Sequence, residues 1–263
     1  MPSLDRNGIW GEPTSTLDWC EENYVVTPYI AEFWNTVSNI VMIVPPLLCG
    51  LHYRRIGMEL RYVYLNMALL VVGVGSWLFH MTLKYEMQLL DELPMIYGTA
   101  LLIYTLHHTT SNSKYSSNSD IVIPVSYCLT ASVVYVTMRN PILHQTFYGL
   151  LVFLLIGKSV QTCNQQPRII PYAAISFCLY LIGFILWNVD NICCNSVRLM
   201  RYNVDPGYEP VTQLHAWWHL FSGAATSLQI VFCAYARALH CKKKCSVEMW
   251  YYCWPYLRMR EEL

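Results

Sequence analysis

Long apolar runs alternate with short polar segments along most of this chain. Seven of the runs have roughly the length and composition of a bilayer-spanning helix, which needs about 17 to 25 mainly apolar residues. They are Phe33–Leu51, Tyr62–Phe79, Leu89–Leu106, Ile121–Met138, Ile142–Ile156, Ile169–Val189 and Ala216–Tyr235. The pattern predicts an all-α integral membrane protein. Its seven-helix transmembrane bundle would occupy residues 33–238, between a polar segment at 1–32 and an interfacial tail at 239–263.

Composition supports a membrane location, and the basic residues predict an orientation. Hydrophobic residues make up 55% of the 263 residues and charged residues only 13%, about half the share found in soluble domains. The loops on one predicted side, together with the C-terminal tail, hold 12 of the 17 Lys and Arg residues. Because basic residues concentrate on the cytosolic side, we expect a cytosolic C-terminus and a luminal N-terminus. The net charge of zero gives no reason to propose nucleic-acid binding.

Two histidines four residues apart open the last apolar run. His215 and His219 would share one face of a helix, about 6 Å apart along its axis. At this spacing two imidazoles can hold one cation. A third histidine, His80, closes the second apolar run. Polar residues at this depth in a membrane are functional candidates, so the pattern predicts a metal site.

The predicted topology brings further polar residues to the luminal ends of these helices. Ser76 lies one turn before His80, Asp91 lies near the start of the third helix, and Asp190 lies near the end of the sixth. Three imidazoles with one open position are typical of catalytic Zn²⁺. A carboxylate and a hydroxyl nearby would act as general base and as hydrogen-bond donor to the oxyanion. We therefore expect Asp91 and Ser76 to be catalytic, and the substrate to be a lipid amide or ester.

Simpler interpretations of these residues remain open. Histidine pairs at this spacing occur by chance on many helices, and a helical serine often bonds the carbonyl four residues before it. The helix macrodipole alone would favour Asp91 at a helix start. Asp190 would be equally well explained as a structural partner of Arg198 or Arg201.

Oxygen-bearing side chains also gather before the first apolar run. They are Asp18, Glu21, Glu22, Asn23 and Glu32. Such oxygens suit Ca²⁺, although the spacing does not match an EF-hand loop. A solvated acidic turn with a capping box from Ser15 to Asp18 explains the segment more simply.

Three cysteines map to the predicted luminal side, where disulfides persist. They are Cys20, Cys193 and Cys194. We expect one bridge, from Cys20 to either of the two neighbours.

Five longer motifs are specific enough to suggest a family. They are Thr-Ser-Thr-Leu-Asp-Trp-Cys-Glu-Glu-Asn-Tyr (14–24), Ile-Ala-Glu-Phe-Trp-Asn-Thr (30–36), Gly-Ser-Trp-Leu-Phe-His-Met-Thr-Leu-Lys-Tyr-Glu-Met-Gln-Leu-Leu-Asp-Glu-Leu-Pro-Met (75–95), Trp-Asn-Val-Asp-Asn (187–191) and His-Ala-Trp-Trp-His (215–219). With these motifs the chain resembles the alkaline ceramidases, and among them the type also called alkaline phytoceramidase. The resemblance runs from about Gly11 to the end of the seventh apolar run. It implies a multi-pass amidase of the endoplasmic reticulum and Golgi membranes that hydrolyses ceramide to a sphingoid base and a fatty acid.

The resemblance also assigns roles to individual residues. It implies a catalytic Zn²⁺ held by His80, His215 and His219, with Ser76 and Asp91 beside the bound water. It implies a structural or regulatory Ca²⁺ bound by Asp18, the carbonyl of Trp19, Glu21, Asn23 and Glu32. It further implies a luminal disulfide between Cys20 and Cys194.

Two other functions compete with this one. The first is a related zinc hydrolase that acts on another lipid amide or ester. The second is a zinc-containing seven-helix receptor of the adiponectin or progestin type. Such receptors place an additional helix or domain before the first span, and a non-catalytic metal site would not need Asp91.

Overall fold

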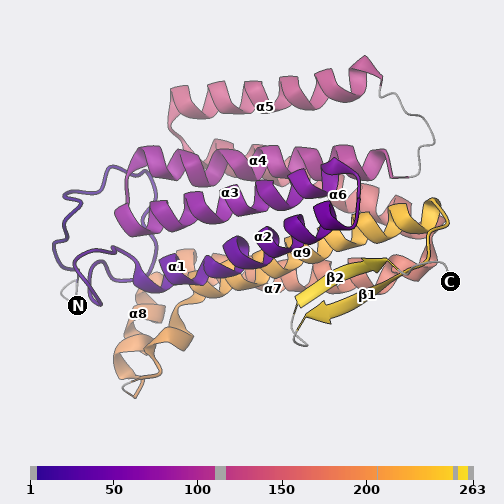
Figure 1. Cartoon of the computed structure of the whole chain (residues 1–263). Coiled ribbons are helices and arrows are strands. Elements are labelled where there is room, and N and C mark those ends of the chain that lie inside the picture. The colour runs from indigo at the N-terminus through magenta and orange to yellow at the C-terminus, as the bar shows by residue number, and fades with distance from the viewer. Residues whose placement is uncertain (1–4, 110–116, 206, 251–253, 260–263) are drawn as a thin grey trace.

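The structure, a computed structural model, describes residues 5–109, 117–205, 207–250 and 254–259. It is a bundle of long helices that lie side by side, with a small hairpin at one end (Figure 1). The long helices are α2 (Ile40–Arg55), α3 (Leu60–Thr82), α4 (Tyr85–His107), α5 (Asn118–Met138), α6 (Pro141–Gln165), α7 (Ile170–Ile192) and α9 (Leu214–His240). The shorter ones are α1 (Phe33–Ser38), α8 (Cys194–Asn203) and the 3₁₀ turns η1 (Pro167–Ile169) and η2 (Glu209–Thr212).

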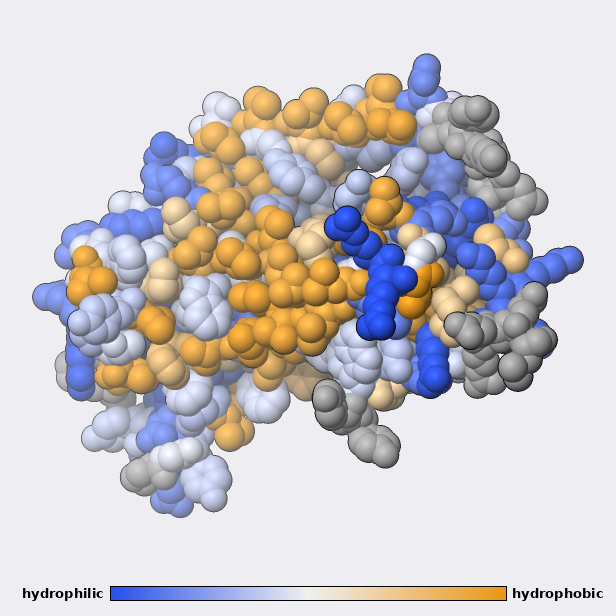
Figure 2. Space-filling model, viewed as in Figure 1, coloured by the Kyte–Doolittle hydropathy of each residue, from blue (hydrophilic) through white to orange (hydrophobic). Residues whose placement is uncertain are grey.

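The predicted membrane spans agree with the helices in part. In the described chain, six helical segments are long and apolar enough to cross a membrane: 33–55, 60–82, 85–107, 118–138, 141–165 and 167–192. On the face shown in Figure 2, apolar residues cover much of the middle of the molecule, and hydrophilic residues lie mainly towards its two ends. Helix α9 covers the seventh predicted run and has 27 residues, but it is not among the six. Its histidine, serine and glutamine side chains lower its hydropathy, and all of them except His240 are buried. The count of seven spans and the orientation of the termini stay predictions.

Glycines allow the central helices to approach closely. A Cβ on Gly73 of α3 would lie 2.8 Å from atoms of Met42 on α2. A Cβ on Gly223 of α9 would lie 2.7 Å from the side chain of the same Met42. Small residues serve helix contacts in this way in membrane proteins, where backbones must come near each other to gain dispersion energy. Helices α3 and α9 therefore both approach α2 closely at Met42.

The segment before α1 covers one end of the bundle, called here the N-terminal end. Residues 5–32 contain no helix, so the capping box considered for Ser15 does not form. The Ala31 N–H donates to the Met81 carbonyl and the Glu32 N–H to the His80 carbonyl, both at 3.0 Å. A disulfide links Cys20 to Cys194, while Cys193 carries an exposed free thiol.

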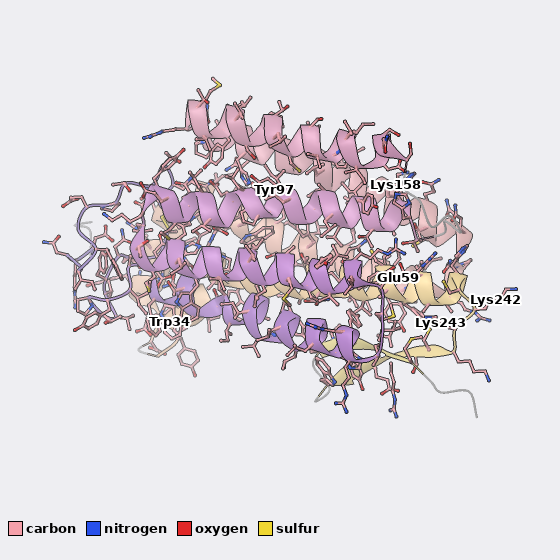
Figure 3. The ribbon with its side chains drawn as sticks, turned by 45° about the horizontal axis from the view of Figure 1, so that its top comes forward. Trp34, Glu59, Tyr97, Lys158, Lys242 and Lys243 are labelled. Carbon is pink, nitrogen blue, oxygen red and sulfur yellow. A yellow bond between two sulfur atoms is a disulfide. The ribbon has the colours of Figure 1, made fainter. Side chains whose placement is uncertain are left out.

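A β-hairpin forms at the opposite end. Strand β1 (Cys245–Trp250) pairs antiparallel with β2 (Trp254–Met259), and Leu257 is fully buried against α9. Lys158, Lys242 and Lys243 lie at this hairpin end, away from Trp34 (Figure 3). The hydropathy pattern does not predict this sheet in an otherwise helical chain. The tail at 239–263 was predicted only to be interfacial, and its residues 251–253 and 260–263 lie outside the described part.

Candidate metal centre and lipid cavity

The three predicted histidines meet at the N-terminal end of the bundle. His80 ends α3, and His215 and His219 lie one turn apart at the start of α9. Their ring centroids are 4.6 to 5.0 Å apart, and one nitrogen from each ring lies within 4.8 Å of the other two. All three side chains are buried, with exposed fractions of 1 to 4%. Three imidazoles in this arrangement are a donor set suited to one divalent transition metal.

Two of the rings are fixed in the tautomer that a metal ligand requires. When Glu32 is ionised its carboxylate can only accept, so Nδ1 of His80 carries the hydrogen and donates it to Glu32. The Ser38 hydroxyl donates to the Asn35 carbonyl at 2.9 Å, so it accepts at 2.8 Å from the Nδ1–H of His219. In both rings Nε2 is therefore free of a proton and available as a ligand. This fits the chemistry of a three-histidine metal site.

The third ring is held by stacking and by the start of its helix. His215 stacks on the Trp19 indole, with centroids 4.0 Å apart and planes at 26°. The Asp190 carboxylate accepts from the backbone N–H groups of His215 and Cys20. In the described chain His215 Nδ1 is buried without a hydrogen-bond partner, so this ring also has an unused donor or acceptor. The aromatic wall and the capped helix start fix the direction of His215.

A serine and a carboxylate lie beside the histidines because two helices approach closely. A Cβ on Gly75 of α3 would lie only 2.1 Å from the Leu90 carbonyl oxygen of α4. This contact brings Ser76 of α3 within hydrogen-bonding reach of the Asp91 carboxyl. Ser76, Asp91, His215 and His219 all line one cavity. The pair predicted to be catalytic therefore faces the predicted metal ligands.

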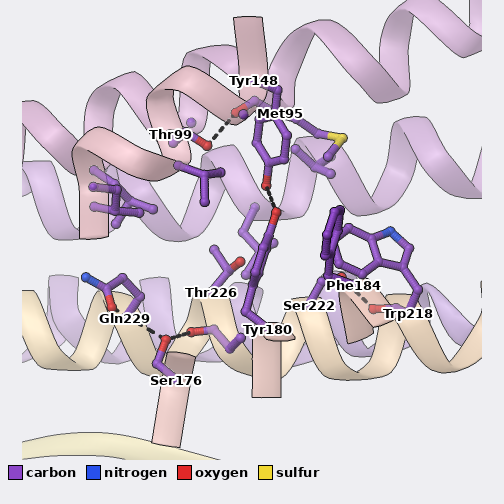
Figure 4. A pocket seen from close by; sticks show the side chains of 18 of the residues that line it. Met95, Thr99, Tyr148, Ser176, Tyr180, Phe184, Trp218, Ser222, Thr226 and Gln229 are labelled. Carbon is purple, nitrogen blue, oxygen red and sulfur yellow. Dashed lines mark hydrogen bonds between the residues drawn. The ribbon is translucent and has the colours of Figure 1, made fainter. Parts of the chain in front are cut away.

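The cavity extends from the histidines along the inside of the bundle. Its volume is about 1040 Å³, and its walls are mainly apolar side chains of α3, α4, α6, α7 and α9. Tyr148 and Tyr180 face each other across it, with their hydroxyl oxygens 3.1 Å apart (Figure 4). Deeper along the bundle, Gln229 donates to the Ser159 hydroxyl at 2.9 Å. A long apolar space that ends at a polar reaction site suits a lipid with its polar group at the histidines.

Known proteins are similar in sequence to this chain over almost its full length. The family model described as Ceramidase matches residues 11–258. The chain belongs to the ceramidase family. It is 46% identical over 256 residues to Alkaline ceramidase 3 of Mus musculus, with 97% of this chain and 96% of the relative covered. It is 32% identical to Alkaline ceramidase YPC1 of Saccharomyces cerevisiae, with 94% and 84% covered. The family inferred from the motifs is confirmed.

The acidic segment of this ceramidase lies directly beside the histidines. Burial raises the pKa of Glu21 and of Glu32 to about 8, and each carboxyl also lies near another acidic group. Burial likewise raises the pKa of Asp18. The Asn23 side-chain oxygen is buried without a partner in the described chain. The two buried acids, Glu21 and Glu32, together with an orphaned amide oxygen fit a hard cation.

The acidic residues are nevertheless less tightly grouped than the histidines. Among the described residues, the groups whose ligand atoms all lie within 4.8 Å do not include these carboxylates. The two Glu21 oxygens accept from the backbone N–H groups of Trp34 and Asn35, at 2.7 and 2.8 Å. Glu21 thus caps α1, a role that its sequence position alone did not reveal.

A second group of potential ligands lies at the hairpin end of this ceramidase. His107, His108 and Asp120 also have ligand atoms within 4.8 Å. However, the Lys158 ammonium lies 3.4 Å from Nδ1 of His107. An ammonium donates to an unprotonated Nδ1, which leaves the proton on Nε2, the nitrogen that faces Asp120. The group is therefore better described as a polar cluster than as a metal site.

Several residues of the site were not assigned from the sequence. Ser38 and the Trp19 ring contact the histidines, although no local spacing connects them. Arg201 forms its ion pair with Glu22, whereas Asp190 was considered as its partner. Only the path of residues 5–32 across the end of the bundle explains these contacts.

Proposed function

We propose that this ceramidase hydrolyses ceramide to a sphingoid base and a fatty acid at a Zn²⁺ centre on the luminal side of the membrane. The observation that carries the proposal is the meeting of three buried imidazoles with Asp91 and Ser76 at one end of an apolar cavity. The relatives named as alkaline ceramidases support the substrate class. Localisation in the endoplasmic reticulum and Golgi is part of the proposal.

His80, His215 and His219 would hold the metal. Bound Zn²⁺ supplies a lowered pKa for a coordinated water and polarises a carbonyl oxygen. Glu32 and Ser38 fix two of the imidazoles from behind, and such outer contacts set ligand orientation and basicity.

Asp91 would transfer the proton, and Ser76 would stabilise the developing negative charge. The Asp91 carboxylate accepts a proton from the attacking water and returns it to the departing amine nitrogen, without which C–N cleavage would stall. The Ser76 hydroxyl donates a hydrogen bond to the oxygen on which negative charge develops. Trp19, Trp187 and Trp218 line this part of the cavity and exclude water around the amide.

The remaining cavity receives the hydrocarbon chains. Its axis follows the helices, so a lipid would lie with its tails along α4 and α7 and its amide near His219. With α9 as the seventh span, the histidine centre would lie at the luminal face and the hairpin at the cytosolic face, as the basic residues indicate.

A Ca²⁺ site in residues 18–32 would support the first helix. Asp18, Glu21, Asn23, Glu32 and the Trp19 carbonyl are its proposed ligands. Glu32 contacts Asn35, the Trp19 N–H and His80 together, so the same side chain touches the acidic segment and one zinc ligand. Removal of Ca²⁺ with EGTA should therefore lower turnover while Zn²⁺ stays bound. Unchanged turnover in EGTA would contradict this role.

The deciding experiment compares two variants of the detergent-purified protein. His215→Ala should lose both bound zinc, counted by mass spectrometry, and sphingosine release from ceramide. Asp91→Asn should keep the zinc and lose about 10²- to 10⁴-fold in turnover. His52→Ala, at the hairpin end, is the control and should keep both.

The same experiment separates the competing functions. Full turnover in Asp91→Asn would refute the hydrolytic mechanism and favour a receptor with a structural metal. Release of product only from lipids other than ceramide, in a panel of lipid amides and esters, would identify a related hydrolase.

A further inference from the structure

A buried glutamate and a buried histidine face each other next to the proposed catalytic aspartate. Glu92 follows Asp91 in α4, and His144 lies in the first turn of α6. Their exposed fractions are 6% and 3%, and both line the cavity. The proposed mechanism does not use either residue.

Both ring nitrogens of His144 face oxygens of Glu92. Nε2 lies 2.8 Å from the backbone carbonyl oxygen, and Nδ1 lies 3.5 Å from Oε1 of the carboxyl group. A carbonyl oxygen only accepts, so Nε2 carries a hydrogen. In a neutral ring Nδ1 would then present a lone pair towards a negative carboxylate, which is repulsive. The contact is favourable only when one additional proton lies on Nδ1 or on Oε1.

The other carboxyl oxygen ties three elements together. Oε2 of Glu92 accepts from Gln88 Nε2 at 3.0 Å and from the Tyr135 hydroxyl of α5. Gln88 in turn donates to Thr16 in the N-terminal segment at 2.8 Å. Tyr135 and Ala131 are the buried residues of α5, so this network is a main attachment of that helix. Glu92 thereby joins α4 to α5, α6 and the N-terminal segment.

From this geometry we propose that Glu92 and His144 share one buried proton and that the pair positions Asp91. Successive residues of a helix point about 100° apart, so fixing Glu92 on the α5–α6 side directs Asp91 towards Ser76 on α3. The titratable groups around the pair are Asp91 on α4, Tyr135 on α5 and Tyr148 on α6, whose ring stacks on His144 with centroids 6.1 Å apart. The positioning role rests on the proposed ceramide hydrolysis, whereas the shared proton does not.

Glu92→Gln is the decisive variant because its side-chain amide can make every contact of the Glu92 carboxyl group, and these contacts no longer need the shared proton. Its Oε1 accepts from Gln88 and Tyr135, and its NH₂ group donates to Nδ1 of a neutral His144. We expect Glu92→Gln to keep kcat within about threefold. Glu92→Ala should lose about 100-fold in kcat, since a displacement of Asp91 by about 1 Å costs this much. Its zinc content and KM should be nearly unchanged. Both variants are assayed by sphingosine release, with zinc counted by mass spectrometry.

The pH dependence of thermal stability tests the proton itself. The shared proton stabilises the folded state where it is bound, and that stability is lost as the pH rises and the proton leaves. The melting temperature of the wild type should therefore fall more steeply on the alkaline side than that of Glu92→Gln. Superimposable profiles would overturn the shared proton. A Glu92→Gln variant as inactive as Glu92→Ala, with zinc bound, would overturn the positioning role. Absence of ceramide hydrolysis in the wild type would refute the proposed function and leave the stability test valid.

Discussion

Replacing Gly75 by alanine should separate Asp91, the proposed catalytic aspartate, from Ser76. The new Cβ would lie 2.1 Å from the Leu90 carbonyl oxygen and 2.9 Å from the Asp91 nitrogen, whereas ordinary contact begins at 3.4 Å. The α4 backbone must therefore retreat by about 1.3 Å. Helix α3 is held by the Glu32–His80 contact and by Gly73 against Met42, so α4 is the helix that moves.

The size of the effect follows from this displacement. Overpacking of this kind costs about 1–3 kcal/mol of stability, and a catalytic group displaced by about 1 Å loses about 100-fold in rate. We expect kcat for sphingosine release to fall about 100-fold in Gly75→Ala, with zinc content unchanged because the ligands lie on α3 and α9. Activity, zinc content and melting temperature are measured on the same detergent-purified samples.

A matched substitution controls for the change of residue type. A Cβ on Gly157, within α6, would meet nothing within 4 Å. Gly157→Ala should therefore keep its activity and gain about 0.5–1 kcal/mol, since alanine is the better helix former. Wild-type kcat and melting temperature in Gly75→Ala would show that the α3–α4 contact does not hold Asp91 in place.

Three further predictions concern the N-terminal end. Glu32→Gln should weaken zinc affinity by about 10- to 100-fold, because the carboxylate that fixes His80 is lost; a chelator titration measures this, and an unchanged affinity would contradict the role. Cys20→Ser should cost up to about 2–5 kcal/mol by opening the bridge to Cys194, seen as a lower melting temperature that added reductant does not lower further. Burial raises the pKa of Glu21 and Glu32 from 4.5 to about 8, so without Ca²⁺ the folded state holds extra protons and loses stability as the pH rises from about 5 to 8. Ca²⁺ should thus raise the melting temperature more at pH 8 than at pH 6, and an equal effect would argue against these ligands.

Local periodicity predicted the parts of this protein that depend on one helix at a time. The spacing of His215 and His219 placed both on one face of α9, and alternating helix directions placed His80 and Asp91 at the same end. His215 and His219 are among the polar residues that lower the hydropathy of α9, and they also belong to the histidine cluster. This explains why α9, although it lies inside the bundle, has a lower hydropathy than the six candidate spans.

Contacts made by irregular chain were not predictable in the same way. The position of Glu32 against His80 and of Trp19 against His215 depends on how residues 5–32 cross the end of the bundle. No repeat in the sequence encodes that path. The hairpin was missed for another reason: β1 is only six residues long, too short for its alternation of polar and apolar residues to predict a strand.

The proposed ligands of the metal centre come from widely separated parts of the chain. His80 lies in α3, whereas His215 and His219 open α9, the last long helix. A ribosome must therefore release more than two hundred residues before the three rings can meet. Until then the nascent polypeptide has an incomplete set of imidazoles. On the proposed mechanism, it therefore cannot hydrolyse ceramide while it is still being inserted into the membrane.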